Sequence, residues 1–157
     1  MTSKSDFAED EWTRVKRAPF VAGMAISLAD PGGPIEAIRE IAATLKTVTG
    51  ATQAGGLVGA VATEVTEEAR QRQSPLAGFK PKGALAGQEI LDELRGVNAI
   101  VTEKATQTDA DAYRAWLHAA AREAAEAAKE GGFLGFHAER VSEGEQRMLD
   151  SLREALG

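Results

Sequence analysis

Apolar residues recur every three or four positions through most of the chain, and polar residues fill the positions between them. This spacing is typical of amphipathic α-helices, whereas half-buried strands alternate at every second position. The expected helical segments cover about 8–29, 35–48, 57–71, 86–103 and 108–129, with a last one from 142 onward. The pattern therefore predicts an all-α fold, a compact bundle of about six helices.

The apolar positions also indicate which side of each helix is buried. In the fourth segment, the residues expected to face the core are Ile90, Leu91, Leu94, Val97 and Val101. In the second segment, they are Ile35, Ile38, Ile41, Ala42 and Leu45. The charged residues of the second segment, including Glu40, fall away from this apolar face, so the segment is predicted to be amphipathic.

Proline and glycine residues mark the expected helix ends. Pro19 lies within the first segment and removes a backbone donor there, so we expect a kink or a break near residues 16–18. The stretch "SPLAGFKPKG", residues 74–83, holds two prolines and two glycines and is expected to be a connector. It divides a single domain, residues 1–157, into two candidate halves at 7–73 and 84–157.

The stretch "KEGGFLGFHAERVSEGE", residues 129–145, has two interpretations. In the structural one, Gly131 ends the fifth helix, Phe136 covers the end of the bundle, and Ser142 with Glu145 forms a capping box. In the functional one, carboxylates and an imidazole converge on a divalent cation, since both groups ligate such ions. The candidate ligands in this stretch are Glu130, His137, Glu139, Glu143 and Glu145.

The two halves of the chain share a pattern. The stretch "MAISLADPGGPIEAIREI" aligns with "AAEAAKEGGFLGFHAERVSEGEQRML" so that Asp30 faces Glu130. Each reads as an alanine-rich helix, an acidic residue, glycines and a second amphipathic helix. This pattern indicates a weak internal duplication, and chance similarity between alanine-rich sequences is the alternative.

The windows "LADPGGPIEAI" and "AKEGGFLGFHAERVSEGEQRMLDSLREALG" resemble the acidic glycine turns of tellurite-resistance B-like proteins. The chain is also similar to another family of bacterial helical proteins. The first resemblance implies an all-helical bacterial protein with an acidic face that binds divalent cations. It makes Asp30 the turn residue and Glu36 and Glu145 the helix-opening carboxylates, although "DPGG" stands here where that family has "DG". Both lines of reasoning together nominate as metal ligands Asp30, Glu36, Glu130, His137, Glu139 and Glu145.

Composition and charge disfavour several classes of protein. The chain has no cysteine, which excludes thiol nucleophiles, disulfides and thiolate metal sites. Its net charge of -6 disfavours nucleic acid as a partner. The longest uncharged run, residues 18–29, is too short to span a membrane, and the acidic N-terminus does not read as a signal peptide. We therefore expect a cytoplasmic protein with no membrane span.

Catalytic motifs are missing from the sequence. Neither GxSxG nor HExxH occurs, so we expect no catalytic or cofactor-binding residue, and no cofactor other than a divalent cation. Gly55 and Gly59, in "QAGGLVGAV", have no lysine of a phosphate-binding loop after them. They are instead expected to let two helices approach closely.

Three functional hypotheses follow. The leading one is a non-enzymatic helical protein that acts by protein–protein association, as a homodimer or with another protein, with an acidic cation-binding turn as an addition. The second is a binding module that holds an apolar small molecule between helices, in a cavity flanked by Trp116 and Phe136. The third is a metal-dependent enzyme that uses Glu130, His137 and Glu139.

Overall fold

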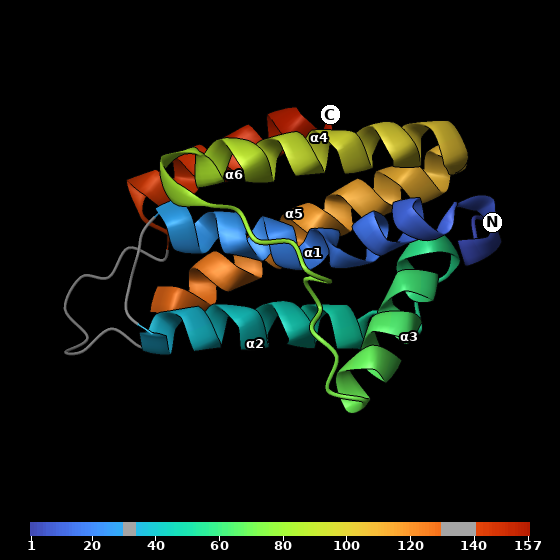
Figure 1. Cartoon of the computed structure of the whole chain (residues 1–157), viewed down its shortest axis with the longest axis horizontal. Helices are drawn as coiled ribbons and strands as arrows, with labels where there is room; N and C mark the ends of the chain where they lie inside the picture. The colour runs from blue at the N-terminus through green and yellow to red at the C-terminus, as the bar shows by residue number, and fades with distance from the viewer. Residues whose placement is uncertain (30–33, 130–140) are drawn as a thin grey trace.

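The computed structural model describes residues 1–29, 34–129 and 141–157, with only the backbone described at 34–38 and 128–129. Within these ranges there are six α-helices and no strand, so the expected all-α bundle is confirmed (Figure 1). The helices are α1 (Glu9–Ala29), α2 (Pro34–Gly50), α3 (Gly56–Arg70), α4 (Ala86–Lys104), α5 (Gln107–Lys129) and α6 (Glu143–Leu156). Two short 3₁₀ turns, η1 (Lys4–Asp6) and η2 (Gly83–Leu85), lie before α1 and α4.

The central helix of the bundle is α1, which packs against each of the other described helices. Figure 1 shows α4 and α6 on one side of α1, α2 on the other, and α3 at an angle near the N-terminal end. Most residues between Ala18 and Ile26 are buried, as expected for a helix surrounded by others. In the second half of the sequence, α5 packs most extensively against α2 and α1 of the first half, so both halves contribute to one core.

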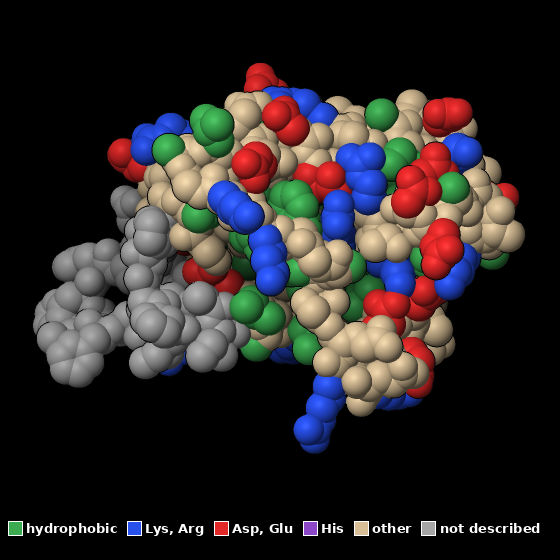
Figure 2. All heavy atoms as spheres, in the orientation of Figure 1, with side chains coloured by type: hydrophobic (Ala, Val, Ile, Leu, Met, Phe, Trp, Pro, Cys, Tyr) green, Lys and Arg blue, Asp and Glu red, His purple; other side chains and the backbone are tan. Residues whose placement is uncertain are grey.

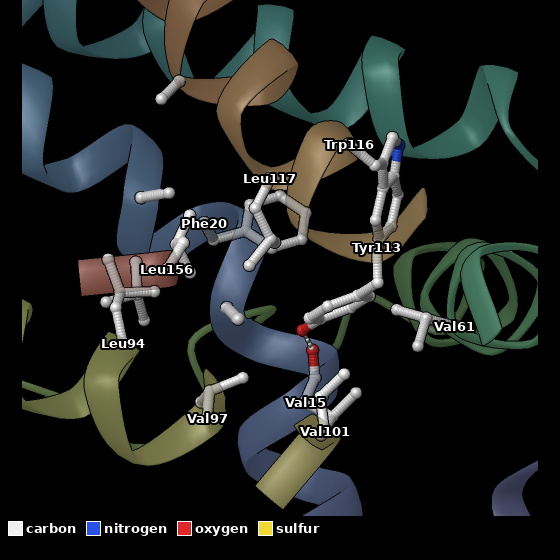
Figure 3. Packing of buried hydrophobic residues seen from close by; sticks show 14 of the residues in the cluster. Val15, Phe20, Val61, Leu94, Val97, Val101, Tyr113, Trp116, Leu117 and Leu156 are labelled. Carbon is white, nitrogen blue, oxygen red and sulfur yellow. Dashed lines mark hydrogen bonds between the residues drawn. The ribbon is translucent and has the colours of Figure 1, made fainter. Parts of the chain in front are cut away.

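Helical periodicity predicts most of the core correctly. On α4, four of the expected positions are buried, and Leu91 is only half-buried. Figure 3 shows Leu94, Val97 and Val101 of this helix pointing towards α1, with Leu156 of α6 beside Leu94. The expected core residues that are buried on α3, α5 and α6 are Leu57, Val58, Val61, Val65, Tyr113, Trp116, Leu117, Ala120, Ala124, Leu149, Leu152 and Leu156.

Pro19 does not break the first helix, which continues through it from Glu9 to Ala29. The expectation of two separate helices is therefore wrong. Proline has no N–H to donate to the carbonyl four residues earlier, which here is that of Val15. The buried Tyr113 hydroxyl donates to this carbonyl instead, at 2.6 Å (Figure 3). Burial raises the pKa of Tyr113 well above its ordinary value, so the hydroxyl keeps the proton that it donates.

The capping box expected at the start of α6 is confirmed. The Glu145 N–H donates to the Ser142 hydroxyl at 3.2 Å, and the Ser142 N–H donates to the Glu145 carboxylate at 2.7 Å. Only 1% of Glu145 is exposed. This pair satisfies two backbone donors that a helix N-terminus would otherwise leave without partners.

The expected role of Gly59 in helix–helix packing is wrong. A Cβ atom at Gly59 would lie 1.8 Å from the carbonyl oxygen of Ala54, in the turn just before α3. At Gly55, a Cβ atom would make only an ordinary contact with Met1. The glycine at Gly59 therefore lets α3 begin directly against its own preceding turn, and it does not bring a second helix closer.

Candidate ligand-binding pocket

The helices α1 and α2 approach each other closely at Gly23. A Cβ atom built there would lie 2.7 Å from the Thr44 hydroxyl oxygen, so only glycine leaves room for Thr44 against α1. The Thr44 hydroxyl donates to the backbone carbonyl of Glu40, one turn earlier on α2, at 2.9 Å. One turn further along α1, the Ser27 hydroxyl donates to the Glu40 carboxylate.

These contacts determine which side of α2 is buried. The buried side comprises Glu40 at 3% exposure, Thr44 at 1% and Val48 at 0%. Ile41, expected in the core, is 58% exposed, and Ala42 is exposed as well. The predicted apolar face of α2 is therefore wrong over the residues whose side chains are described, because Gly23 and Ser27 of α1 accept the polar side of α2.

A pocket of about 250 Å³ lies beside this contact. Phe20 and Met24 of α1 and Ile41 of α2 form apolar walls, and Pro75 and Leu76 of the 74–83 connector form the side opposite to α1. Ser27, Glu40 and Thr44 supply the buried or half-buried polar part of the lining. The arrangement is a mostly apolar cavity with a few convergent polar groups, which is the usual composition of small-molecule sites.

The pocket opens on the face of the molecule where the connector passes over α1 and α2 (Figure 1). Figure 2 shows hydrophobic side chains gathered beside the connector on this face, with basic and acidic side chains around them. A second hollow of about 220 Å³ adjoins the pocket and shares Phe20, Ile41 and Pro75 with it. Ile41 therefore lies at the junction of the two hollows, which accounts for an exposed isoleucine next to a buried glutamate.

The connector that forms one wall is attached to α1. The Arg17 guanidinium lies over the ring of Phe79, 5.1 Å from its centre, which is a favourable cation–π geometry. The same guanidinium binds the Glu93 carboxylate of α4, with 2.7 Å between nitrogen and oxygen, and Arg14 binds it at 3.0 Å. Leu76 and Phe79 also pack against the core, so the pocket wall has both apolar and electrostatic anchors.

The Glu93 carboxylate has a lowered pKa. Burial alone would raise the pKa of this group, but hydrogen bonds and positive charges from Arg14 and Arg17 outweigh burial and bring the pKa below its ordinary value. Glu93 therefore stays ionised at neutral pH and keeps Arg17 in position beneath Phe79.

The candidate metal ligands lie mostly beyond the part of the chain that can be described. Those outside the described residues are Asp30, Glu130, His137 and Glu139. Glu36 lies in α2, where only the backbone is described, and Glu145 holds the capping box of α6. Among the described side chains, no three His, Asp or Glu residues are grouped so that they could hold a metal ion. The cation site stays a prediction.

The small-molecule cavity expected beside Trp116 and Phe136 has a different counterpart. Trp116 does not line the pocket on α1 and α2, and Phe136 lies outside the described residues. The Trp116 indole N–H and the Nε2 atom of His118 are buried and have no hydrogen-bond partner within the described residues. The residues that the sequence analysis missed are Ser27, Glu40 and Thr44. Their signal is the spacing of Glu40, Thr44 and Val48, which recurs every four positions on one helix face.

Comparisons with known proteins identify no relative. A scan of protein-family models, a search of curated proteins and a search of solved structures each found no match to this chain. In the described residues, no helix combines the length and the apolar character needed to cross a membrane.

Proposed function

We propose that this protein is a binding module that holds a small apolar molecule in the pocket between α1, α2 and the 74–83 connector. The observation that carries the proposal is the pocket of about 250 Å³ with mostly apolar walls. Burial of an apolar ligand there would remove its surface from water, which is the main source of affinity for such molecules.

Two anchors support a pocket that exists before the ligand arrives. Gly23 and Thr44 fix how closely α1 and α2 approach, and the Arg17–Phe79 contact holds the connector. A preformed site avoids the cost of ordering its walls on binding, so more of the burial energy appears as affinity.

The size of the pocket limits the ligand. An engineered cavity of about 150 Å³ holds benzene, whereas sites for drug-sized molecules begin at about 300 Å³. At about 250 Å³, this pocket lies between those cases. The expected ligand therefore carries one aromatic ring or a short alkyl chain.

A nuclear magnetic resonance titration with propylbenzene, a neutral molecule of this size, tests the proposal. We expect saturable shifts of the backbone amide signals of Gly23, Ser27 and Thr44. The absence of saturable shifts, or shifts confined to residues far from the pocket, would overturn the proposal.

Two matched tryptophan variants locate the binding. Ile41→Trp adds bulk at the mouth of the pocket, where Ile41 is 58% exposed. Leu85→Trp is the control, since Leu85 is 68% exposed and does not line the pocket. Propylbenzene affinity should fall about tenfold or more in the first variant, the loss of roughly one buried ring contact, and stay unchanged in the second. Equal effects of the two variants would contradict the assignment.

Protein–protein association is the second candidate function. It is supported by Ile41 and Leu28, which are large apolar residues at 58% and 43% exposure. We propose that a second copy of the chain covers Ile41 if the protein is a homodimer. Sedimentation equilibrium should then show a dimer that Ile41→Glu converts to a monomer, with Leu85→Glu as the control. A monomeric wild type would end this hypothesis for self-association.

The cation-binding turn and the metal-dependent enzyme remain proposals from the sequence. Calorimetric titration of the metal-free protein with calcium, magnesium, manganese and zinc tests both. Saturable binding that a Glu130→Gln, His137→Ala double variant abolishes would support a site in residues 129–145. No heat of binding from any of the four ions would remove the metal from both proposals.

A further inference from the structure

The polar part of the pocket has a definite hydrogen-bonding character. Ser27, Glu40 and Thr44 lie together where α1 and α2 approach, and the first and third are hydroxyl side chains. A hydroxyl carries a single proton, so it donates one hydrogen bond and otherwise accepts. Which partner receives that proton decides what the hydroxyl offers to a ligand.

Both hydroxyl protons are already engaged within the protein. The Thr44 hydroxyl donates to the Glu40 backbone carbonyl at 2.9 Å, and the Ser27 hydroxyl donates to the Glu40 carboxylate. The oxygen lone pairs of these hydroxyls still accept, and an ionised carboxylate accepts without donating. The inner polar lining of the pocket is therefore built from hydrogen-bond acceptors.

We propose that the pocket selects ligands that carry a primary amine on a small apolar body. An ammonium group brings three donors and a positive charge, which complements hydroxyl oxygens and the Glu40 carboxylate. The sign of the Glu40 charge, and not the number of its partners, decides this preference. This inference rests on the proposed small-molecule function and names the ligand class for the same pocket.

The same lining rejects two related classes of ligand. A carboxylate on an apolar body would meet acceptors and a like charge, which disfavours its ionised form. A hydrocarbon of the same shape would gain the apolar burial but would leave the buried polar groups with no contribution to affinity. The expected order of affinity is therefore amine, then hydrocarbon, then carboxylate.

Three probes of similar shape test this order: 2-phenylethylamine, propylbenzene and phenylacetate. Each is titrated into the wild-type protein at neutral pH and about 0.15 M salt, a condition that screens long-range attraction to an acidic protein. The readout is the backbone amide shifts of Gly23, Ser27 and Thr44. The amine should bind about tenfold or more tightly than propylbenzene, as expected for a charge-assisted hydrogen bond, and phenylacetate should bind most weakly.

Glu40→Gln tests the charge itself, because it keeps the shape of the side chain. Its amine affinity should fall to the level of propylbenzene, while its propylbenzene affinity stays within about threefold of the wild type. Glu126→Gln is the matched control, since it removes one negative charge from a separate hollow between α2 and α5. An equal loss of amine affinity in both variants would overturn the inference, because it would show attraction to the net charge of the protein.

The outcomes separate the two proposals. Saturable propylbenzene binding without a preference for the amine overturns the ligand class and leaves the proposed function intact. No saturable binding of any probe overturns both. If Glu40→Gln fails to fold, the order of the three probes on the wild-type protein decides the inference, and an amine no tighter than propylbenzene overturns it.

Discussion

At the scale of single residues, Tyr113 takes over the hydrogen bond that Pro19 cannot make. Proline leaves the Val15 carbonyl without its usual helical donor, and a buried carbonyl without a partner costs free energy. The Tyr113 hydroxyl, on α5, donates to it at 2.6 Å. A local defect in one helix is thus repaired by a side chain from another, which links α1 to α5 at the centre of the core.

Tyr113→Phe should lower the free energy of unfolding by about 1–3 kcal/mol, because it leaves the buried Val15 carbonyl without a donor. In a Pro19→Ala background, the new backbone N–H at position 19 can donate to the same carbonyl. The Tyr113→Phe penalty should then shrink, which denaturant unfolding of the four proteins in this double-mutant cycle measures. Equal penalties in both backgrounds would contradict the repair.

Gly56 is a second residue with a specific local role. Its φ is +61°, and a Cβ atom there would lie 1.8 Å from the Asp109 carboxylate. Asp109 in turn accepts a hydrogen bond from the Thr2 N–H at 2.6 Å, and hydrogen bonds from Thr2 bring the pKa of Asp109 below its ordinary value. The glycine therefore leaves space for a carboxylate that ties the N-terminus to the start of α5.

Gly56→Ala should destabilise the protein by roughly 1–3 kcal/mol, through backbone strain at positive φ and the clash with Asp109. Gly87→Ala is the control, because a Cβ atom at Gly87 meets nothing within 4 Å. That variant should stay within about 0.5 kcal/mol of the wild type or be more stable. Thermal unfolding followed by circular dichroism measures both, and equal stability of the two variants would count against the proposed contact.

At the scale of elements, the helices differ in how far their sequence predicts their burial. The apolar stripes of α4 and α6 match the buried face closely, because each packs a continuous apolar side against α1. In α2, hydropathy favours Ile41 and Ala42 as core residues, yet Glu40 and Thr44 are buried. The period of α2 alone does not reveal that Gly23 and Ser27 of α1 lie opposite and accept polar neighbours.

The candidate pocket was unpredictable for the same reason. Its polar residues lie on two helices, and only the packing of α1 on α2 brings Ser27 next to Glu40. The connector at 74–83 was recognised from its prolines and glycines, but its role as a pocket wall depends on Phe79 lying against Arg17. The sequence therefore predicted the helices and most of the core, whereas contacts between elements define the site.

The ion pair between α1 and α4 leads to a prediction about pH. Glu93→Gln should cost roughly 1.5–3 kcal/mol at pH 7, since it removes hydrogen bonds to charged groups of Arg14 and Arg17. The folded pKa of Glu93 is lowered, so its stabilisation is present above the unfolded value of about 4.3 and is lost as the pH falls through the folded pKa. The gap between wild type and variant should narrow below about pH 4.3. Urea unfolding at several pH values measures it, and a gap that widens on acidification would refute the ion-pair explanation.

At the scale of the whole molecule, α1 organises the fold. It packs against every other described helix, and α5 from the second half contacts α2 and α1 of the first more extensively than it contacts α4. The candidate halves at 7–73 and 84–157 therefore share one apolar core. The internal duplication suggested by the sequence stays a prediction about the origin of the halves.

Separated halves should fail to fold cooperatively. In a fragment of residues 84–157, α4 and α5 would expose the faces that they pack against α1, and too little apolar surface would remain buried for stability. Neither this fragment nor residues 1–73 should show a cooperative thermal transition by circular dichroism, whereas the full chain should. A cooperative transition in either fragment would show that one half is an independent unit.

The most direct test of the central claim is an isotope-filtered nuclear Overhauser experiment on the methyl-labelled protein with unlabelled propylbenzene. If the pocket holds small apolar molecules, cross-peaks should connect the ligand to the methyl groups of Met24, Ile41 and Leu76, which line it. Leu85, an exposed residue outside the pocket, should show none. Cross-peaks to Leu85 alone, or none at saturating ligand, would contradict the claim.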